Sequence, residues 1–444
     1  MTDTIFAPAT APGRAAIAIL RLSGPGAAAA LRDLGGRLPP PRRAAHLRFR
    51  QPHTGETIDD GIGIFFPGPA SFTGEDMAEL QLHGSRAVLQ AMLDVLGARP
   101  GFRLAEPGEF THRAFLNGKL DLTEAEAIAD LVQAETEAQR RQALRQLDGA
   151  FGRQCEAWRE RLIAAQARLE AEIDFPEEGL PAGLWAAVRA ELRAIRAEIA
   201  ALLDDRHAGE RLREGVSIAI LGPPNSGKSS LMNTLARRDV AITSSIAGTT
   251  RDVIEVALDL GGYPVVLADT AGLRDSADAL EEEGIRRARA RADSADLRLV
   301  LLDATKPEEA AAIRPILNSS AILALNKIDL AQSRDLGWAD RLGAAPALHL
   351  SVATGEGLGA LVEHLQEAVA ASLASAGAAL VTRARHRQAL EAALAALDRF
   401  PAAGLPELAA EDLRGAARAL GRITGKVDVE DMLDRLFREF CIGK

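Results

Sequence analysis

The run GPPNSGKS at 222–229 limits the possible folds of this chain more than any other stretch. It follows GVSIAIL, an apolar run typical of a buried strand, and precedes SLMNTLA, whose spacing predicts a helix. A G-x-x-x-x-G-K-[ST] motif in that position is a P-loop, in which Gly222 and Gly227 let backbone amides close around phosphate groups. The Lys228 ammonium meets the β and γ oxygens, and the Ser229 hydroxyl can ligate Mg²⁺. The sequence therefore predicts an α/β domain that binds a nucleotide at the start of a helix.

Two later runs belong to the phosphate side of this predicted site. DTAG at 269–272 follows the strand-like run YPVVLA, so Asp269 stands where it can hold the water shell of the metal. The amide of Gly272 then faces the γ-phosphate. SSIAGTTRD at 244–252 lies between the P-loop and DTAG, where a loop that senses the γ-phosphate belongs, and Thr250 there is a candidate metal ligand.

Two further runs identify the base. NKID at 326–329 follows the apolar run AILAL, and the Asp329 carboxylate can accept from both N1–H and the 2-amino group of guanine. Adenine does not offer that pair of donors, and each charge-assisted bond of about 1.5–3 kcal/mol gives roughly tenfold to hundredfold discrimination. SVATGEG at 351–357 adds backbone amides near the base. The order and placement of the four motifs predict GTP as the ligand.

The residue after DTAG limits the hydrolytic mechanism. Many GTPases carry a water-orienting glutamine there, whereas this chain has Leu273, whose side chain cannot orient water. Hydrolysis therefore needs another carboxylate or a cation. The run EEE at 281–283 offers the first, and Asn225 beside the phosphates can help to coordinate a monovalent ion. Taken by itself, the glutamate run is better explained as a helix N-terminus that is stabilised by the helix dipole.

The sequence pattern changes on both sides of the nucleotide motifs. Residues 1–117 alternate strand-like runs with turns and predict an α+β domain. Residues 118–212 and 377–444 show helical spacing, so we expect one all-helical domain interrupted by an α/β nucleotide domain at 213–376. The helices before and after the insertion should then pack together. TEAE, with Thr123 and Glu126, predicts a capping box at the start of the helical part.

Composition and charge exclude several classes of protein. The chain lacks a stretch of about eighteen apolar residues, and two cysteines cannot form a disulfide framework, so we expect a cytoplasmic protein without a membrane span. A net charge of −10 argues against a large nucleic-acid footprint. The basic runs RRARAR at 286–291 and RARHR at 383–387 are interpreted as solvated helix faces. If RNA is a substrate, we expect a partner to carry much of the contact.

The last four residues resemble a lipidation box at first sight. A prenylated cysteine is followed by two aliphatic residues and a small or apolar one, a pattern that Gly443 and Lys444 do not fit. We therefore expect no lipid on Cys441. Its thiol stands between apolar Phe440 and Ile442, and packing is favoured over a nucleophilic role.

GPPNSGKS, AGTTRD, DTAGLR and NKID resemble the motifs of the TrmE–Era–EngA group of P-loop GTPases. Longer runs at 71–84, 107–131 and 421–444, the last being GRITGKVDVEDMLDRLFREFCIGK, resemble the MnmE (TrmE) family of tRNA modification GTPases. The resemblance spans essentially the whole chain. It departs from the family pattern at Ser85, where glycine is common, at SVA, where SAx is commoner, and at Ser244, where threonine is usual.

The resemblance implies a fold and a reaction. The fold is an α+β domain that binds folate and forms a homodimer, a helical domain, and an inserted G domain. The reaction is potassium-stimulated GTP hydrolysis, coupled to installing an aminomethyl or carboxymethylaminomethyl group at C5 of the wobble uridine of certain tRNAs. The implied partner is MnmG, which brings FAD and NADH into a heterotetramer. The implied one-carbon donor is 5,10-methylenetetrahydrofolate, with 5-formyltetrahydrofolate as its analogue.

The resemblance also assigns roles to residues. It makes Glu281 the catalytic carboxylate, which overrides the helix-terminus interpretation of that run. Its magnesium ligands are Ser229 and Thr250, its potassium ligands are Asn225, Ser244, Ile246 and Thr249, and its folate contacts are Arg21, Glu79, Lys119 and Lys444. The expected GTP contacts are Asn225, Ser226, Gly227, Lys228, Ser229, Ser230, Ser244, Ser245, Ile246, Ala247, Gly248, Thr249, Thr250, Asp269, Thr270, Ala271, Gly272, Asn326, Lys327, Asp329, Ser351, Val352 and Ala353.

Two alternatives share the nucleotide motifs. A ribosome-assembly GTPase of the Era or EngA type would be expected to carry a basic RNA-binding domain or a second G domain, and this chain has one P-loop and an acidic balance. A membrane-remodelling GTPase would need a basic amphipathic or apolar insertion segment, which the sequence does not show.

Overall fold

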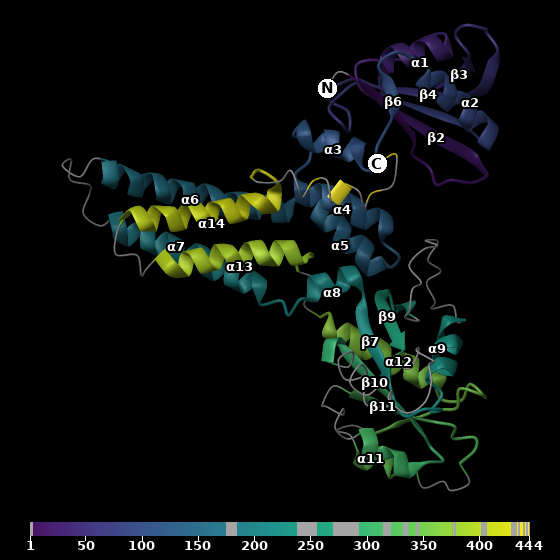
Figure 1. The fold of residues 1–444 in the computed structure, drawn as a ribbon, viewed down its shortest axis with the longest axis vertical. Helices are drawn as coiled ribbons and strands as arrows, with labels where there is room; N and C mark the ends of the chain where they lie inside the picture. The colour runs from purple at the N-terminus through teal and green to yellow at the C-terminus, as the bar shows by residue number, and fades with distance from the viewer. Residues whose placement is uncertain are drawn as a thin grey trace, which may run out of the picture. The chain divides into compact units, whose positions relative to one another are not determined.

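The computed structural model describes residues 3–174, 184–237, 255–269, 293–313, 321–331, 336–342, 346–374, 376, 379–400, 406–427, 433, 436, 437, 440 and 443. These residues form two compact units. The first contains Met1–Ala129, Gln146–Glu191 and Ala395–Lys444, and the second contains Asp130–Arg145 and Leu192–Leu394. Each unit is therefore assembled from segments that lie far apart in the sequence. Figure 1 shows the course of the chain by colour.

A six-stranded sheet is the centre of the N-terminal part of the first unit. Its elements are β1 (Thr4–Pro8), β2 (Ala15–Ser23), α1 (Ala27–Gly35), β3 (Ala45–Arg50), β4 (Thr57–Phe66), β5 (Met77–Gly84), α2 (Arg86–Gly97) and β6 (Phe102–Leu104). The strand order is β3-β4-β5-β2-β1-β6, and every pair is antiparallel except β1 with β6. This combination of strands and helices confirms the predicted α+β character of the N-terminal residues.

Alternation along the strands separates the two faces of this sheet. Leu20 and Leu22 of β2 and Leu80 of β5 point into a core that α1 and α2 complete. The intervening residues, such as Arg21 of β2 and Glu79 of β5, point to the other face. These two residues are paired directly across the strands, so the sheet register itself places their side chains together.

Long helices complete the first unit and continue into the second. They are α3 (Glu109–Leu116), α4 (Leu122–Gln133), α5 (Glu137–Leu147), α6 (Ala150–Asp174), α7 (Leu184–Leu203), α13 (Ala384–Arg399) and α14 (Pro406–Thr424). Helices α6 and α14, which come from opposite sides of the nucleotide motifs in the sequence, lie side by side (Figure 1). This packing confirms that an α/β domain is inserted into a helical one. No helix in the described part of the chain is long and apolar enough to span a membrane.

The start of α4 differs from the predicted capping box. The Asp121 carboxylate accepts from the Glu124 amide at 2.9 Å, and the Glu124 carboxylate accepts from the Asp121 amide at 2.8 Å. The box is therefore DLTE, and the predicted pairing of Thr123 with Glu126 is wrong. Thr123 instead donates its hydroxyl to Asp121 at 2.7 Å, and Glu126 is buried inside the helix. Both boxes have the required spacing, and the chain uses the earlier one because the carboxylate of Asp121 already faces the open amides.

The basic run at 383–387 also differs from its prediction. Arg387 is 7% exposed as a residue, and its guanidinium lies 2.6 Å from the Asp205 carboxylate. Arg383 pairs with Asp130 at 2.6 Å. Burial lowers the pKa of Arg387, and the neighbouring carboxylates outweigh burial and raise it. These arginines are structural ion pairs within the second unit, so the interpretation as a solvated helix face is wrong for them. The other basic run, RRARAR, lies outside the described residues.

A second six-stranded sheet forms the centre of the second unit. Its elements are α8 (Ala208–Glu214), β7 (Val216–Leu221), α9 (Lys228–Ala236), β8 (Glu255–Leu260), β9 (Tyr263–Asp269), β10 (Leu297–Asp303), the 3₁₀ turn η1 (Pro307–Glu309), α11 (Ala310–Ile313), β11 (Ala321–Asn326), the 3₁₀ turn η3 (Ala339–Arg341), β12 (Leu348–His349) and α12 (Leu358–Ser372). The strand order is β12-β11-β10-β7-β9-β8, with all pairs parallel except β8 with β9.

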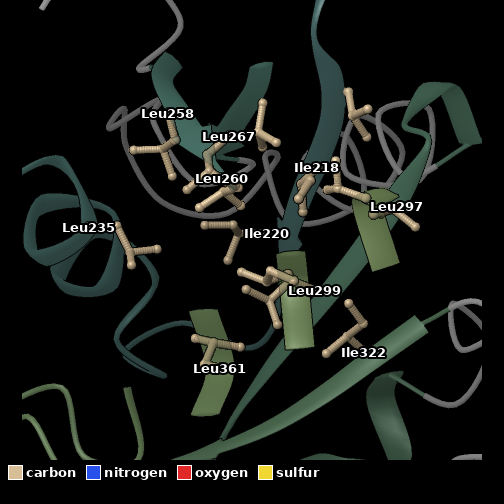
Figure 2. Packing of buried hydrophobic residues seen from close by; sticks show 14 of the residues in the cluster. Ile218, Ile220, Leu235, Leu258, Leu260, Leu267, Leu297, Leu299, Ile322 and Leu361 are labelled. Atoms are coloured by element: carbon tan, nitrogen blue, oxygen red, sulfur yellow. The ribbon is translucent and has the colours of Figure 1, made fainter. Parts of the chain in front are cut away.

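A buried apolar core packs against one face of this sheet. Ile218 and Ile220 of β7, Leu299 of β10, Leu235 of α9 and Leu361 of α12 gather in one buried cluster (Figure 2). The central strands β7, β10 and β11 are buried on both faces, as expected for parallel strands that are covered on both sides. Because the strands are parallel, the carboxyl ends of β7, β10 and β11 meet at one edge, which is where ligands of open α/β sheets bind.

Candidate functional site: a nucleotide loop and a second side-chain cluster

The P-loop connects β7 to α9 and closes around its own lysine. Gly222 has φ +149°, and a Cβ there would lie 2.1 Å from the Leu301 carbonyl oxygen of β10. Gly227, with φ +102°, would place a Cβ 2.2 Å from the Asn326 side chain. Only glycine fits at both positions. The Lys228 ammonium donates to the carbonyl of Gly222 at 2.9 Å, so its charge is held at the loop.

Asn326 connects three of the predicted motifs. Its side-chain amide donates to the Ser226 carbonyl of the P-loop at 2.8 Å and accepts from the Val352 amide at 3.0 Å. The side chain is buried and bonded on both sides, so it fixes the spacing between the P-loop, β11 and the SVA loop. The structure thus brings GPPNSGKS, NKID and SVATGEG together, as the sequence predicts.

Lys327 has a partner that the sequence reasoning missed. Its backbone is left-handed, with φ +65°, and its ammonium lies 2.7 Å from the Asp303 carboxylate at the end of β10. The other oxygen of Asp303 accepts from the Thr305 amide and hydroxyl at 2.9 and 2.6 Å. The only signal in the sequence is that LRLVLLD ends in a carboxylate. The register that sets Asp303 beside Asn326 comes from the pairing of β10 with β11 in the structure.

The structure describes some of the other residues predicted for the GTP site and leaves the rest undescribed. Asp329 follows β11 with an exposed side chain, and Asn225 is exposed with φ +63°. Ser229 and Ser230 are exposed in the first turn of α9, and Ser351 is buried. Asp269 ends β9. The predicted residues at 244–250 and 270–272, together with Glu281 and Lys444, lie outside the described residues.

A second cluster forms on the face of the N-terminal sheet opposite α1 and α2. The Arg21 guanidinium lies 3.0 Å from the Glu79 carboxylate. It also lies 5.9 Å from the Phe72 ring centroid and 5.8 Å from that of Phe110, within the range of cation–π attraction. The carbonyl of Gly443 is 3.5 Å from Arg21. The family resemblance implied Arg21 and Glu79 as folate contacts, and it did not point to either phenylalanine.

The loop between β4 and β5, residues 67–76, brings Lys119 to the same region. The Lys119 ammonium donates to the Pro69 carbonyl at 3.0 Å, and Asn117 donates to the Thr73 carbonyl at 2.7 Å. The same loop carries Phe72, which contacts Arg21. Two of the four predicted folate residues, Arg21 and Lys119, therefore contact one loop, and Glu79 pairs with Arg21.

Arg113 of α3 forms an ion pair with Glu75 of this loop. The sequence did not predict a role for Arg113. Its side chain is 1% exposed and pairs with Glu75 at 3.1 Å, Glu109 at 3.0 Å and Asp3 at 2.9 Å. Glu75 in turn accepts from the Ser23 hydroxyl at 2.6 Å. Burial raises the pKa of Glu109, and hydrogen bonds from arginines outweigh burial and lower it. A buried arginine with three carboxylates holds the loop to the sheet.

The C-terminal tail reaches the same face. Phe437 and Phe440 pack with Leu122 and Ala125 of α4 in one apolar cluster. Beyond them Gly443 has φ +98°, and a Cβ there would lie 2.1 Å from the Pro8 carbonyl oxygen. The last described residue of the chain therefore lies against the N-terminal domain, next to Arg21.

The chain matches two family models and several known proteins over most of its length. A family model described as the GTP-binding protein TrmE N-terminus matches residues 4–119, and one described as the MnmE helical domain matches residues 122–441. The tRNA modification GTPase MnmE of Rhodospirillum rubrum is 56% identical over 455 residues, covering 100% of this chain and 99% of that protein. The chain belongs to the MnmE family of tRNA modification GTPases. The MnmE of Parvibaculum lavamentivorans is 55% identical and covers 100% of both chains.

Membership of the MnmE family establishes the general activity. The chain hydrolyses GTP in the service of tRNA modification, and the ribosome-assembly and membrane-remodelling alternatives are rejected. Among solved structures, the G domain of the T. maritima FeoB iron transporter is 28% identical and covers 35% of this chain and 98% of its own, with a TM-score of 0.28. Aquifex aeolicus Era bound to GDP and aluminium fluoride is 27% identical over 34% of this chain and 56% of its own, with a TM-score of 0.27. At such TM-scores these likenesses carry no argument.

Replacing Asp303 with asparagine is expected to weaken GTP binding about tenfold, the value of one charge-assisted hydrogen bond. Burial raises the pKa of Asp303, but bonds from Lys327 and Thr305 outweigh it and hold the pKa below its usual range. The carboxylate is thus charged at neutral pH, and its effect is lost only as the pH falls through that lowered pKa. Isothermal titration calorimetry with GTP measures the expected loss of affinity. Glu309→Gln breaks the half-exposed Lys306 pair of 3.0 Å nearby and should change the affinity for GTP less than twofold.

Proposed function

We propose that this GTPase works with MnmG to install an aminomethyl or carboxymethylaminomethyl group at C5 of the wobble uridine. Its one-carbon donor is 5,10-methylenetetrahydrofolate, bound where Arg21 and Glu79 meet the C-terminal tail. The observation that carries this proposal is the approach of Gly443 to within 3.5 Å of Arg21, between residues separated by almost the whole chain. It supports a pocket whose remaining cation, Lys444, is the next residue.

The residues around Arg21 fit a reduced folate. A carboxylate such as that of Glu79 accepts from the ring N–H and amino group of a pterin in the same way as one accepts from guanine. The Phe72 ring, 37% exposed, offers a surface on which a planar pterin can stack. Lys119 and Lys444 provide cations for the carboxylates of the glutamate tail. When bound, the folate supplies the one-carbon unit.

The nucleotide site is proposed to use two metal ions. Ser229 and Thr250 hold Mg²⁺, and Asn225, Ser244, Ile246 and Thr249 hold K⁺. Asn225 supports this assignment, because its side chain is exposed at the P-loop on a left-handed backbone with φ +63°. Glu281 positions the attacking water in place of the glutamine that Leu273 replaces.

The proposed assembly is a homodimer through the N-terminal domain that joins MnmG, with its FAD and NADH, in a heterotetramer in the cytoplasm. The exposed apolar start of β2 supports a dimer contact, since Ile17 is 56% exposed in the single chain. The proposed domain boundaries remain those predicted above: 1–117, 118–212, 213–376 and 377–444.

Nucleoside analysis of tRNA from a strain that lacks this gene tests the modification role. We expect the C5-substituted wobble uridines to disappear and to return when the gene is restored on a plasmid. A plasmid copy carrying Lys228→Ala should not restore them, because the P-loop lysine is removed. Wobble uridines that are unchanged in the deletion strain would reject the proposed modification role.

A further inference from the structure

One segment of the N-terminal domain carries a charge opposite to that of the chain. The chain has a net charge of −10, yet residues 36–55 contain no aspartate or glutamate. We call residues 37–50 of this segment the basic edge. Its basic residues are Arg37, Arg42, Arg43, His46, Arg48 and Arg50.

The fold places these residues at an accessible rim. Strand β3 ends the strand order of the N-terminal sheet, so it is an edge strand. Leu47 and Phe49 are 3% and 0% exposed and point into the core beneath α1. By alternation Arg48 and Arg50 point the other way, and both are exposed. The edge therefore presents a row of cations to solvent.

Most of this charge is uncompensated. Arg37, Arg43 and Arg50 make no ion pair within the part of the chain that the structure describes. Arg48 and His46 share Asp60, at 3.0 and 3.8 Å, and Arg50 also contributes to lowering the pKa of that carboxylate. The neighbouring carboxylate on β4, Asp59, accepts from His83 at 2.8 Å instead. Glu56, in the turn after β3, is exposed and forms no ion pair with the edge in the described residues. Some other arginines of the domain are held by carboxylates, as in Arg99–Asp33 at 2.5 Å and Arg103–Asp3 at 2.6 Å. The exposed Arg14, Arg32 and Arg86 also lack an ion pair in the described residues, but they do not lie together in one acid-free segment.

The basic edge shares a face with the proposed folate pocket. Register pairs His46 with Ile62 and Ile62 with Gln81, on the same face as the directly paired Glu79 and Arg21. Directly paired residues of antiparallel strands point to the same side of the sheet. The edge strand lies three strands from β2, which is about 14 Å at the usual strand spacing. Helices α1 and α2 cover the opposite face.

Charged residues on an edge strand also prevent sheets from pairing edge to edge. That role accounts for Arg48 and Arg50, which stand on the strand. It does not account for Arg37 and Arg43, which stand before β3 and continue the charge. It also does not account for the absence of acidic residues from the whole segment.

We propose that the basic edge binds the phosphate backbone of the tRNA substrate and so holds the anticodon beside the proposed folate pocket. Guanidinium groups pair with phosphates in charge-assisted hydrogen bonds, which position a nucleic acid without reading its sequence. The scarcity of aromatic residues, at 4% of the chain, fits contact with the backbone rather than stacking on bases. This inference rests on the proposed modification of tRNA.

The test compares two matched double variants of the full chain. Arg43→Gln with Arg50→Gln removes two unpaired charges from the basic edge. Arg32→Gln with Arg86→Gln removes two exposed charges from α1 and α2 on the opposite face. The probe is a tRNA transcript with uridine at the first anticodon position, titrated by fluorescence anisotropy at several salt concentrations. We expect about tenfold weaker binding for the edge variant, and a salt slope lower by about 2, with the control unchanged.

The outcomes separate this inference from the proposed function. If the edge variant binds tRNA with the same affinity and salt slope as the control variant, the proposal that the basic edge binds tRNA is overturned. This holds even if deletion of the gene abolishes the modification. Weaker binding to MnmG with unchanged tRNA binding would also overturn it, and would identify the edge as a protein contact. GTP hydrolysis should stay at the parent rate in both variants, because none of these residues belongs to the nucleotide site. Failure of the modification role itself would appear as unchanged wobble uridines in the deletion strain.

Discussion

Gly443→Ala is expected to abolish modification of the wobble uridine while GTP hydrolysis continues at the parent rate. The backbone of Gly443 has φ +98°, which an L side chain adopts only at a cost of about 1–3 kcal/mol. Its Cβ would also lie 2.1 Å from the Pro8 carbonyl oxygen, a backbone atom that cannot rotate away. The tail then has to leave its position beside Arg21, which also removes the folate contact proposed for the next residue, Lys444. The nucleotide site lies in the other unit of the chain and keeps its contacts.

Mass spectrometry of tRNA nucleosides and a GTPase assay together measure this effect. Gly415→Ala serves as the control, because that glycine lies inside α14 and a Cβ there meets nothing within 4 Å. It should leave the modification intact. More than half of the parent modification in the Gly443 variant would show that the tail does not need its observed position.

Glu281→Ala is expected to slow single-turnover GTP hydrolysis in potassium by about a hundredfold or more, the usual contribution of a positioned general base. The physical reason is Leu273, whose apolar side chain leaves the attacking water without an orienting group. The affinity for GTP should change little, since the carboxylate acts on water and not on the nucleotide. Glu281 lies outside the described residues, so this expectation comes from the motif position alone.

Neighbouring glutamates of the same run provide the matched control. Glu282→Ala makes the same chemical change one residue away and should leave the rate within twofold of the parent. If the rate of Glu281→Ala stays within twofold, that residue takes no part in the mechanism. A large loss in Glu282→Ala instead would move the role to that residue.

The nucleotide site was predictable because its chemistry depends on backbone. A P-loop needs glycines where amides approach phosphates, and Gly222 and Gly227 sit where a Cβ would clash with a carbonyl or an amide. Such constraints are local, so they leave a readable pattern. Asp303 was missed because its role depends on a neighbouring strand, and the pairing of β10 with β11 is not visible in either segment alone.

The helical part shows the same limit at a smaller scale. DLTE and TEAE both have the spacing of a capping box, and the choice between them depends on where the chain enters α4. RARHR has the composition of a solvated helix face, yet Arg387 meets Asp205 across a gap of 182 positions in the sequence. The periodicity of a helix indicates which of its sides is apolar. It does not indicate whether a carboxylate on a distant segment of the chain packs against that helix.

The sequence alone predicted the order of the α+β, helical and inserted α/β segments. It also predicted the guanine nucleotide and the motifs expected around its phosphates. Each of these predictions depends on residues that lie close together in the chain. Only the tertiary structure placed Arg21 between two phenylalanines with Gly443 beside it, and left Arg37, Arg43 and Arg50 at a rim without an ion pair in the described part of the chain. Those features arise when strands pair and distant segments pack, and the energies that select one pairing are summed over the whole fold.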